Sequence, residues 1–294
     1  NGLASDLIEY YLGELRAHPA LHDRVEFKIA ISCFHFNLAS RLSALRSVGF
    51  TEKDLAALTN SLKKLTVDLL GPETSLFHSD VAKVQSLAGL RRDAVAIEDD
   101  AVAMYWLLEH GRRYGSLPFS GIARAAFVAV QILTSLRDID VLSTDDLEAF
   151  MSSLSTVNRE LVRDHAAMDR ETFLATYGHL RPGTYDIRTP SYAEDPDRYF
   201  RWSTDRMQER PAEDRSLDGI EKKVGRHLMS VNFDVNAEDL LGFCRSAIEW
   251  RERAKFEFSQ NVSAVLSRLT LVGRRFGFSP DDLSYMSEIG RAHV

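Results

Sequence analysis

The chain has 294 residues and a formal net charge of −7 at pH 7, with 45% hydrophobic and 27% charged residues. This balance is typical of a globular protein, and the negative charge argues against a broad nucleic-acid surface. The best apolar run, residues 125–133, is far shorter than the ~18 residues of a membrane span, and the acidic N-terminus is not a secretory signal. The only two cysteines, Cys33 and Cys244, form neither a disulfide framework nor a zinc site and favour a cytoplasmic protein.

The first part of the chain is expected to be mainly helical. Apolar residues at helical spacing predict a first helix over 3–15, whereas alternation of apolar and polar residues over 25–31 predicts a short strand. A helix is expected over 38–48, ending at Gly49. Another is expected over 51–70, where Thr51 and Asp54 have nearly the spacing of a capping box. Further helices are expected over 75–90 and 94–113.

The second part is also helical, apart from one long loop. Pro118 is expected to open a helix over 119–137, Ser143 to cap one that runs to about 168, and residues 170–176 to form a short one. Helices resume near 217, and Asn236 caps a helix whose pattern continues to 276. Ser279 and Pro280 open a last turn. The sequence therefore predicts a mainly α domain with one short early β strand and a long central loop rich in Pro and Gly.

The central loop is expected over 180–217, where no period is sustained and four of the eight prolines lie. A loop of this length in a compact domain is usually functional or disordered. Its start is the stretch "YGHLRPGTYDIRTPSYAEDP", residues 177–196, and its aromatic content favours order. The polar stretch that follows, residues 203–216, is expected to be mobile.

The stretch 177–196 holds the strongest candidate site. His179 could donate to an anion or shuttle a proton, and Arg181 could bind a carboxylate or phosphate in bidentate fashion. Gly178 and Gly183 allow close approach of the backbone or a positive φ. Three further side chains could orient a polar substrate, the last of them also as a general base: Thr184, Tyr185 and Asp186. The alternative is a structural turn in which His179 and Asp186 only satisfy backbone groups.

Other candidates lie on expected helices. Arg124, among small and apolar residues, either snorkels to solvent or faces an anion in a cleft. Arg253, Lys255 and Asn261 could reach a phosphate, although a charged helix is usually a solvated face. No metal site is expected, because the acidic run at 98–100 has no second acidic cluster at matching spacing.

The last six residues continue no pattern. Residues 289–294 can be encoded by ATC GGA AGA GCA CAC GTC, which resembles a common sequencing adapter. We therefore expect a domain over 1–288 that is an internal fragment of a longer protein, followed by a non-native tail over 289–294.

The stretch "FLATYGHLRPGTYDI", with the "EDPDRYF" that follows it, resembles the central region of ATP-dependent phosphotransferases related to phosphoenolpyruvate synthase, the PEP-utilising enzymes. "YGSLPFSGIARAAFVAVQIL" and "AKFEFSQNVSAVL" are similar to this family too, so the resemblance covers nearly the whole chain. It is closest to the L-glutamine kinase type and more distant from rifampin phosphotransferase. Related enzymes carry Arg directly after the Gly-His pair. Here Arg181 is displaced by one position, which disfavours a rifamycin-like substrate.

The resemblance implies a relay between domains. In this family an ATP-grasp domain, which binds ATP and Mg²⁺, phosphorylates a histidine on a mobile domain, and that domain delivers the phosphoryl group to the central domain. The chain would be the helical central, substrate-binding domain, inactive by itself, with both other domains outside it. Its acceptor would be a small polar molecule, such as L-glutamine at its amide. His179, Arg181 and Arg124 would position the transferred group, and Arg181 and Asp186 would hold an amino acid.

Two functions from different classes follow. The first is the substrate-binding part of a cytoplasmic kinase, with no nucleic-acid or membrane partner. The second is a non-catalytic helical module that links or docks other domains, with the central turn serving structure only.

Overall fold

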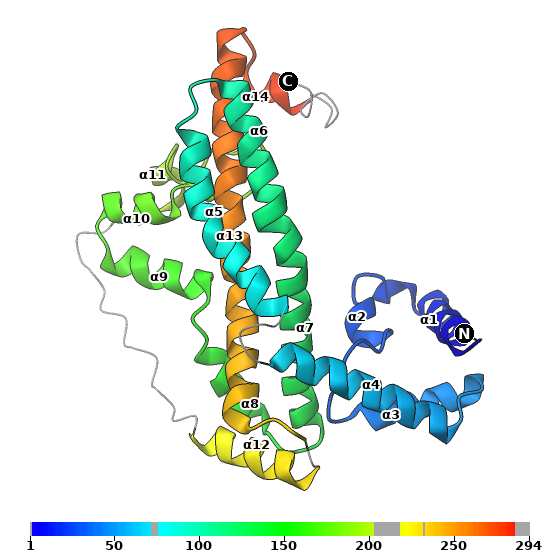
Figure 1. The fold of residues 1–294 in the computed structure, drawn as a ribbon. Coiled ribbons are helices and arrows are strands. Elements are labelled where there is room, and N and C mark those ends of the chain that lie inside the picture. The colour runs from blue at the N-terminus through cyan, green and yellow to red at the C-terminus, as the bar shows by residue number, and fades with distance from the viewer. Residues whose placement is uncertain (1, 72–75, 203–217, 232, 286–294) are drawn as a thin grey trace. The chain divides into compact units, whose positions relative to one another are not determined.

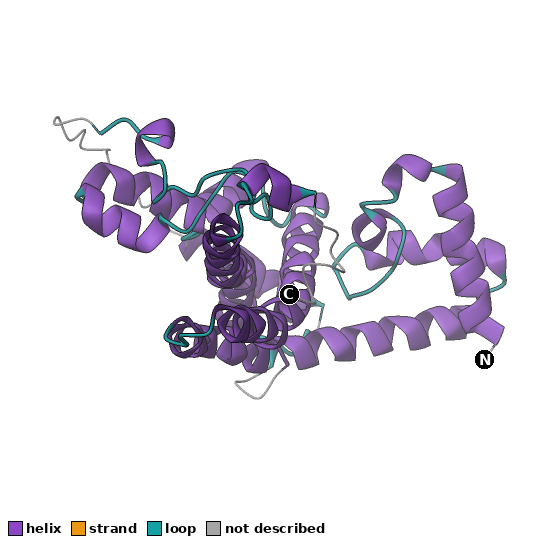
Figure 2. Cartoon of the chain, turned by 90° about the horizontal axis from the view of Figure 1, so that it is seen from above, coloured by secondary structure: helices purple, strands orange, loops and turns teal. Residues whose placement is uncertain are grey.

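The structure, a computed structural model, describes residues 2–71, 76–202, 218–231 and 233–285 (Figure 1). It is 76% helix, and no strand occurs in these ranges; Figure 2 shows helices and loops only. The prediction of a mainly α fold is confirmed. Two expectations, the mobile stretch 203–216 and the tail 289–294, lie outside the described residues.

The chain divides into two compact units, each built from three segments. Unit 1 comprises residues 1–78, 123–154 and 214–248, and unit 2 comprises residues 79–122, 155–213 and 249–294. Two long helices, α7 (Leu117–Asp138) and α13 (Ala237–Arg275), each have residues in both units.

Unit 1 contains mostly helices from the first quarter of the chain. Its α-helices and 3₁₀ helices, besides the shared parts of α7 and α13, are α1 (Gly2–Ala17), η1 (Pro19–Leu21), α2 (Val25–Lys28), α3 (Leu38–Leu42), η2 (Ser43–Val48), α4 (Glu52–Leu70), α8 (Thr144–Ser152) and α12 (Asp218–Ser230).

Unit 2 holds the central turn. Besides its shares of α7 and α13, its elements are α5 (Leu76–Val95), whose first residues belong to unit 1, α6 (Asp100–His110), the π-helix η3 (Gly111–Ser116), α9 (Val157–Ala167), α10 (Arg170–Tyr177), α11 (Pro196–Tyr199) and α14 (Pro280–Ser284).

The predicted strand over 25–31 is wrong. Val25–Lys28 form the short helix α2, and the residues after it, up to α3, form a loop that belongs to no strand. Side chains satisfy the backbone there: Arg41 donates to the carbonyls of Ile29 (3.2 Å) and Ala30 (3.0 Å), and the Ile31 N–H donates to the Tyr11 hydroxyl (2.9 Å). Ile29 and Ile31, two of the alternating apolar residues, are buried although they belong to no sheet. An apolar alternation needs a partner strand to become β-structure, and none is present in the described ranges.

Three helix boundaries agree with the sequence, whereas the helix expected over 94–113 begins only at Asp100, after the N-cap Asp99. Thr51 and Asp54 form a capping box, as do Ser143 and Asp146, and η2 ends at Gly49 with φ +97°. The helix expected from Ser143 to 168 is two helices, α8 and α9. They are interrupted at 153–156, a Ser- and Thr-rich stretch in which the Ser155 N–H donates to Glu249 (2.7 Å).

Pro118 does not open a separate helix as expected. The chain is helical without a break from Asp100 to Asp138, because η3 joins α6 to α7. A proline inside an α-helix clashes with the carbonyl four residues before it. The wider π turn lies directly before Pro118 and accommodates the ring.

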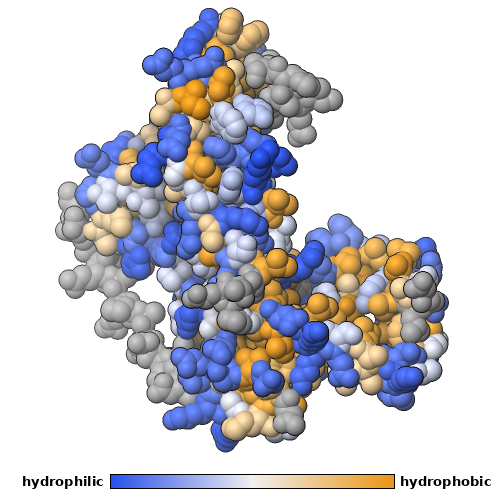
Figure 3. Space-filling view, viewed as in Figure 1, coloured by the Kyte–Doolittle hydropathy of each residue, from blue (hydrophilic) through white to orange (hydrophobic). Residues whose placement is uncertain are grey.

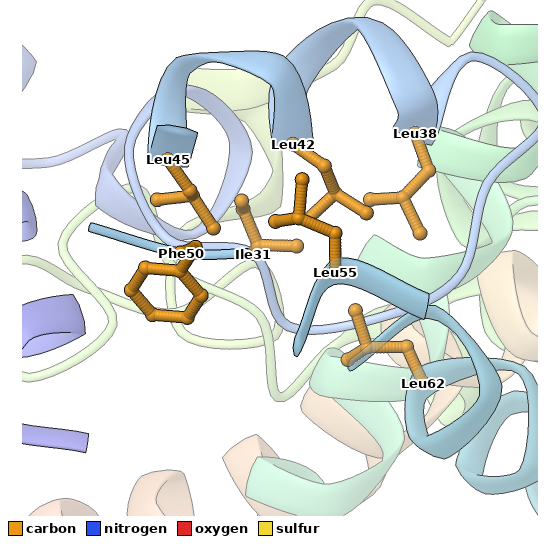
Figure 4. Packing of buried hydrophobic residues seen from close by; sticks show 7 residues of the cluster. All are labelled: Ile31, Leu38, Leu42, Leu45, Phe50, Leu55 and Leu62. Carbon is orange, nitrogen blue, oxygen red and sulfur yellow. The ribbon is translucent and has the colours of Figure 1, made fainter. Parts of the chain in front are cut away.

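One hydrophobic cluster of unit 1 lies around α3, η2 and α4. Seven buried residues pack there, as Figure 4 shows: Ile31, Leu38, Leu42, Leu45, Phe50, Leu55 and Leu62. On the face drawn in Figure 3, both hydrophilic and hydrophobic side chains lie on the surface of α1 to α4. Unit 2 has two clusters. One packs Ala94, Met104, Leu107 and Val265, and the other packs Phe173, Tyr177 and Phe256 beside the central turn.

The helical run from Asp100 to Asp138 contains an 18-residue window of mean hydropathy 1.5, of which 56% is buried inside the protein. By length and composition alone this run could cross a membrane. Most of the window packs in the core, which is also what the central helix of a folded domain does.

Both cysteines are free and buried. The Cys33 thiol donates to the side-chain oxygen of Gln131 (3.5 Å), and burial raises its pKa to about 11. Cys244 lies against the Ala129 carbonyl (3.8 Å), and burial raises its pKa still further.

Candidate functional site

The central turn folds back on itself after α10. The Tyr192 N–H donates to the Leu180 carbonyl (2.8 Å) and the Ala193 N–H to the Gly178 carbonyl (2.9 Å), so the two limbs of the turn lie side by side. A Cβ on Gly178 would meet the Leu174 carbonyl and would lie 2.9 Å from the Ala193 Cβ. Gly178 is therefore needed for close approach of the backbone and not for a positive φ.

Arg181 is the most buried charged side chain of the turn, with 3% of its side chain exposed. It donates from Nη1 to the Thr189 carbonyl (3.0 Å) and from Nη2 to the Ser263 hydroxyl on α13 (3.1 Å), and Nη2 lies 3.6 Å from a Glu194 carboxylate oxygen. Its Nε is buried and has no hydrogen-bond partner among the described residues. Arg181 thus fixes the turn to α13 and retains one unused donor.

His179 is held by packing against an aromatic ring. The imidazole meets Phe256 edge-on with ring centroids 4.7 Å apart, and its Nε2 is buried without a hydrogen-bond partner in the described part of the chain. Burial, and next the positive charge of Arg91, lower the pKa of His179 to about 4. At pH 7 the ring is neutral, so it is a proton acceptor and not the cationic anion-binder that the sequence permitted.

Asp186 is paired within the turn. Its carboxylate accepts from Arg188 Nε (3.0 Å), Arg188 Nη2 (3.2 Å) and the Arg188 N–H (3.0 Å). The hydrogen bonds from Arg188 lower the pKa of Asp186, which makes this carboxylate a poor general base. Of its neighbours, Thr184 is half-buried and Tyr185 is 67% exposed.

A pocket of about 590 Å³, which we name the Arg181 pocket, lies between the turn, α13 and the start of α14. Three guanidinium groups and two carboxylates line it, together with two hydroxyls. Its residues are Arg181, Ile187, Arg188, Pro190, Glu194, Asp195, Ser267, Thr270, Leu271, Arg274 and Pro280. This mixture suits a small ligand that carries both an anionic and a cationic group.

Two charged groups in the Arg181 pocket differ in availability. Glu194 accepts from the Ser191 N–H (2.7 Å) and the Ser267 hydroxyl (3.2 Å). Partial burial raises the pKa of Glu194, but the Ser191 N–H and the Arg181 charge outweigh it and lower the pKa, so the group is anionic at pH 7. Arg274 is exposed, and its side chain takes part in no ion pair or hydrogen bond with the described residues.

Arg181 is the one predicted site residue that lines this pocket. His179, Thr184, Tyr185 and Asp186 do not line it, and neither do the candidates predicted on helices. Arg253 pairs with Glu160 (2.5 Å) at a second cleft of about 380 Å³ that also contains Trp250. Lys255 is exposed, and Arg124 is an exposed residue of unit 1. Asn261 is 1% exposed and structural, since it donates to the Leu107 carbonyl (2.9 Å) and accepts from Arg91 (3.2 Å).

The sequence alone does not reveal the part of the pocket that α13 contributes. Ser267, Thr270 and Arg274 are spaced three and four residues apart, which places them on one helical face. The same spacing occurs on any solvated helix face, so it does not by itself indicate a binding site. The position of the central turn beside this face identifies the pocket.

No group of three or more His, Cys, Asp or Glu that could hold a metal ion occurs in the part of the chain that the structure describes. No family model, no curated protein and no solved structure matches this chain.

Proposed function

We propose that this chain is the substrate-binding part of an ATP-dependent phosphotransferase, of the phosphoenolpyruvate synthase-like kind that its sequence resembles. The observation that carries the proposal is the Arg181 pocket, because it combines the stretch that bears the resemblance with the exposed guanidinium of Arg274 on α13. Its ligand is a small zwitterion such as glutamine, and the protein works in the cytoplasm with neither nucleic acid nor membrane as partner.

The charges of the pocket define how such a ligand would lie. Arg274 and the unused Nε–H of Arg181 suit a carboxylate, and Glu194 and Asp195 suit an ammonium group. A pocket of about 590 Å³ accommodates an amino acid together with the phosphoryl group that is transferred to it.

The transfer would use domains outside this chain. ATP and Mg²⁺ bind to one of them, and a phosphohistidine on another brings the phosphoryl group. The P–N bond of the phosphohistidine would break, a new bond would form from phosphorus to the acceptor nitrogen or oxygen, and the proton that the acceptor loses would end on the released carrier imidazole. His179, whose pKa of about 4 makes it a weak base, lies in the turn, and Arg181 is a positioning residue that fixes the turn.

Ligand binding by the whole 294-residue chain tests this proposal. We expect calorimetry to detect L-glutamine binding that weakens about tenfold in Arg274→Gln, because a charge-assisted contact is lost. The matched control is Arg92→Gln, which removes an exposed arginine of the same unit away from the pocket. Equal binding by Arg274→Gln and the wild-type chain, or no binding of any amino acid, would refute the pocket assignment.

One observation favours the second candidate, a helical linking or docking module. The polar side chains of the turn are largely used internally, since Arg181 bonds to Thr189 and Ser263 and Asp186 pairs with Arg188. If the turn is structural only, Arg181→Met lowers the free energy of unfolding by about 2 kcal/mol or more but leaves phosphoryl transfer per folded molecule unchanged.

The kinase proposal expects another result for Arg181→Met in the full-length protein. Phosphorylation of the carrier histidine by ATP continues, while transfer to the acceptor is lost. Following both steps with labelled ATP therefore separates the two functions.

A further inference from the structure

A further pocket, distinct from the Arg181 pocket and from the cleft at Trp250, lies wholly within unit 1, and neither proposed function uses it. It has a volume of about 510 Å³ and lies between the segment around α2 and α3 and the last part of α7. We name it the His35 pocket. Its charged and histidine lining residues are Arg24, Lys28, His35, Arg41 and Asp138.

The pocket is positively charged although the whole chain carries −7. Three of its residues are cations and one is an acid. That acid, Asp138, is already neutralised by Arg137, whose Nη2 lies 2.6 Å from a carboxylate oxygen. Three cations without an equal number of carboxylates repel one another, so an anion placed among them is stabilised.

Two of the cations are available to such an anion. Arg24 and Lys28 are four residues apart, at the two ends of α2, which places them on the same side of this helical turn. Both side chains are exposed, and neither takes part in an ion pair or hydrogen bond with the described residues. Arg41 is held in place, because its Nη2 donates to two backbone carbonyls, and it adds a fixed positive charge.

His35 supplies a hydrogen-bonding group of defined polarity. Asn37 Nδ2 donates to Asp138 (3.1 Å), which fixes the amide so that its oxygen lies 2.6 Å from His35 Nδ1. Nδ1 therefore carries the proton, and in the neutral ring Nε2 is a bare acceptor. Burial lowers the pKa of His35, so the neutral ring is the form present at pH 7. His35 is 4% exposed, and Nε2 has no hydrogen-bond partner among the described residues.

These groups are complementary to a ligand that has two chemical features. The cations require an anion with several oxygens, and the buried acceptor of His35 requires a donor such as a hydroxyl. We propose that the His35 pocket binds a small organic phosphate that carries hydroxyl groups, with the phosphate at Arg24 and Lys28 and a hydroxyl toward His35. This site is independent of the Arg181 pocket, which belongs to unit 2.

Calorimetry with glycerol 3-phosphate and the whole chain tests the charge part of the proposal. We expect binding that weakens by about tenfold or more in Arg24→Gln/Lys28→Gln, because two charge-assisted contacts are lost. The matched control, Lys53→Gln/Lys64→Gln, removes two exposed lysines of α4 and changes the net charge of unit 1 equally. It should bind like the wild type.

Three results would overturn the proposal. The wild-type chain could fail to bind glycerol 3-phosphate, both double variants could lose affinity equally, or the pocket variant could bind as well as the wild type. Methyl phosphate tests the hydroxyl part, because it lacks the donor for His35. We expect it to bind roughly tenfold more weakly than glycerol 3-phosphate, and equal affinity would show that the hydroxyl is not recognised.

Discussion

Burial determines the protonation state of His179 at pH 7. In the sequence it was a histidine of unspecified charge beside an arginine. In the fold it packs on Phe256 and shares its surroundings with two arginines, and its pKa falls to about 4. At pH 7 such an imidazole is neutral, so one ring nitrogen carries the single N–H and the other is a hydrogen-bond acceptor.

This shift predicts a pH dependence of stability. The pKa of His179 is about 4 in the folded state and near 6.5 when the chain is unfolded, so the unfolded state binds more protons between these values. Stability that is present above pH 6.5 is therefore lost as the pH falls toward 4, by roughly 2–3 kcal/mol. Chemical denaturation at several pH values should show this loss in the wild type and a smaller one in His179→Gln.

The exposed His18 provides the control for that measurement, since His18→Gln should keep the full pH dependence. An NMR titration of the His179 ring gives an independent check. A midpoint near 6.5 would contradict the expected burial effect.

The location of the candidate site could be predicted from the sequence, but the hydrogen-bond and ion-pair partners of its side chains could not. The loss of helical spacing and the glycines and prolines marked the turn. The neutralisation of Asp186 by Arg188 and the use of Asn261 within the core depend on which side chains meet after folding. Partners far apart in sequence, such as Arg181 and Ser263, carry no local signal.

Helix ends were predictable where local capping residues mark them. The caps at Thr51 and Ser143 and the stop at Gly49 are local chemistry, and all three were found. The prediction of an early strand is wrong because a β-strand needs a second strand to pair with, which the local sequence does not specify. Pro118 failed as a helix start because the π turn before it, η3, lets the helix continue.

The π turn also predicts the effect of one substitution. A Cβ on Gly115 would lie 2.6 Å from the Phe258 Cβ, which is attached directly to the backbone of α13 and cannot swing away. Although alanine favours helix, we expect Gly115→Ala to lower the free energy of unfolding by about 1–3 kcal/mol through overpacking.

Gly89→Ala is the matched comparison for Gly115→Ala. It lies in α5 of the same unit, and its nearest new contact would be at 3.8 Å. This variant should be neutral or stabilised by up to about 1 kcal/mol. If both variants changed the denaturation midpoint alike, close packing at Gly115 would not be the cause.

At the scale of the whole molecule, the two units are joined by more than loops. Each has its own core, yet α7 and α13 contribute turns to both. Unfolding one unit alone would interrupt these helices in the middle and expose unpaired backbone groups. We therefore expect the units to unfold together.

Core truncation in each unit tests this expectation. Leu45→Ala in unit 1 and Leu107→Ala in unit 2 each create a cavity that costs about 2–5 kcal/mol. Both should move a single calorimetric transition to lower temperature, whereas Leu65→Ala, at a 62% exposed position, should hardly move it. Two transitions, each shifted by only one of the core variants, would mean that the units unfold independently.

The two buried thiols have a practical consequence. Because Cys33 and Cys244 are the only cysteines and burial raises the pKa of both, each is shielded from alkylating reagents while the chain is folded. A cysteine introduced at an exposed position, such as Ser40 beside the His35 pocket or Tyr185 on the central turn, becomes the one fast-reacting sulfur. The native sequence is thus a ready background for attaching a fluorophore or spin label at a chosen site, with no prior removal of cysteines.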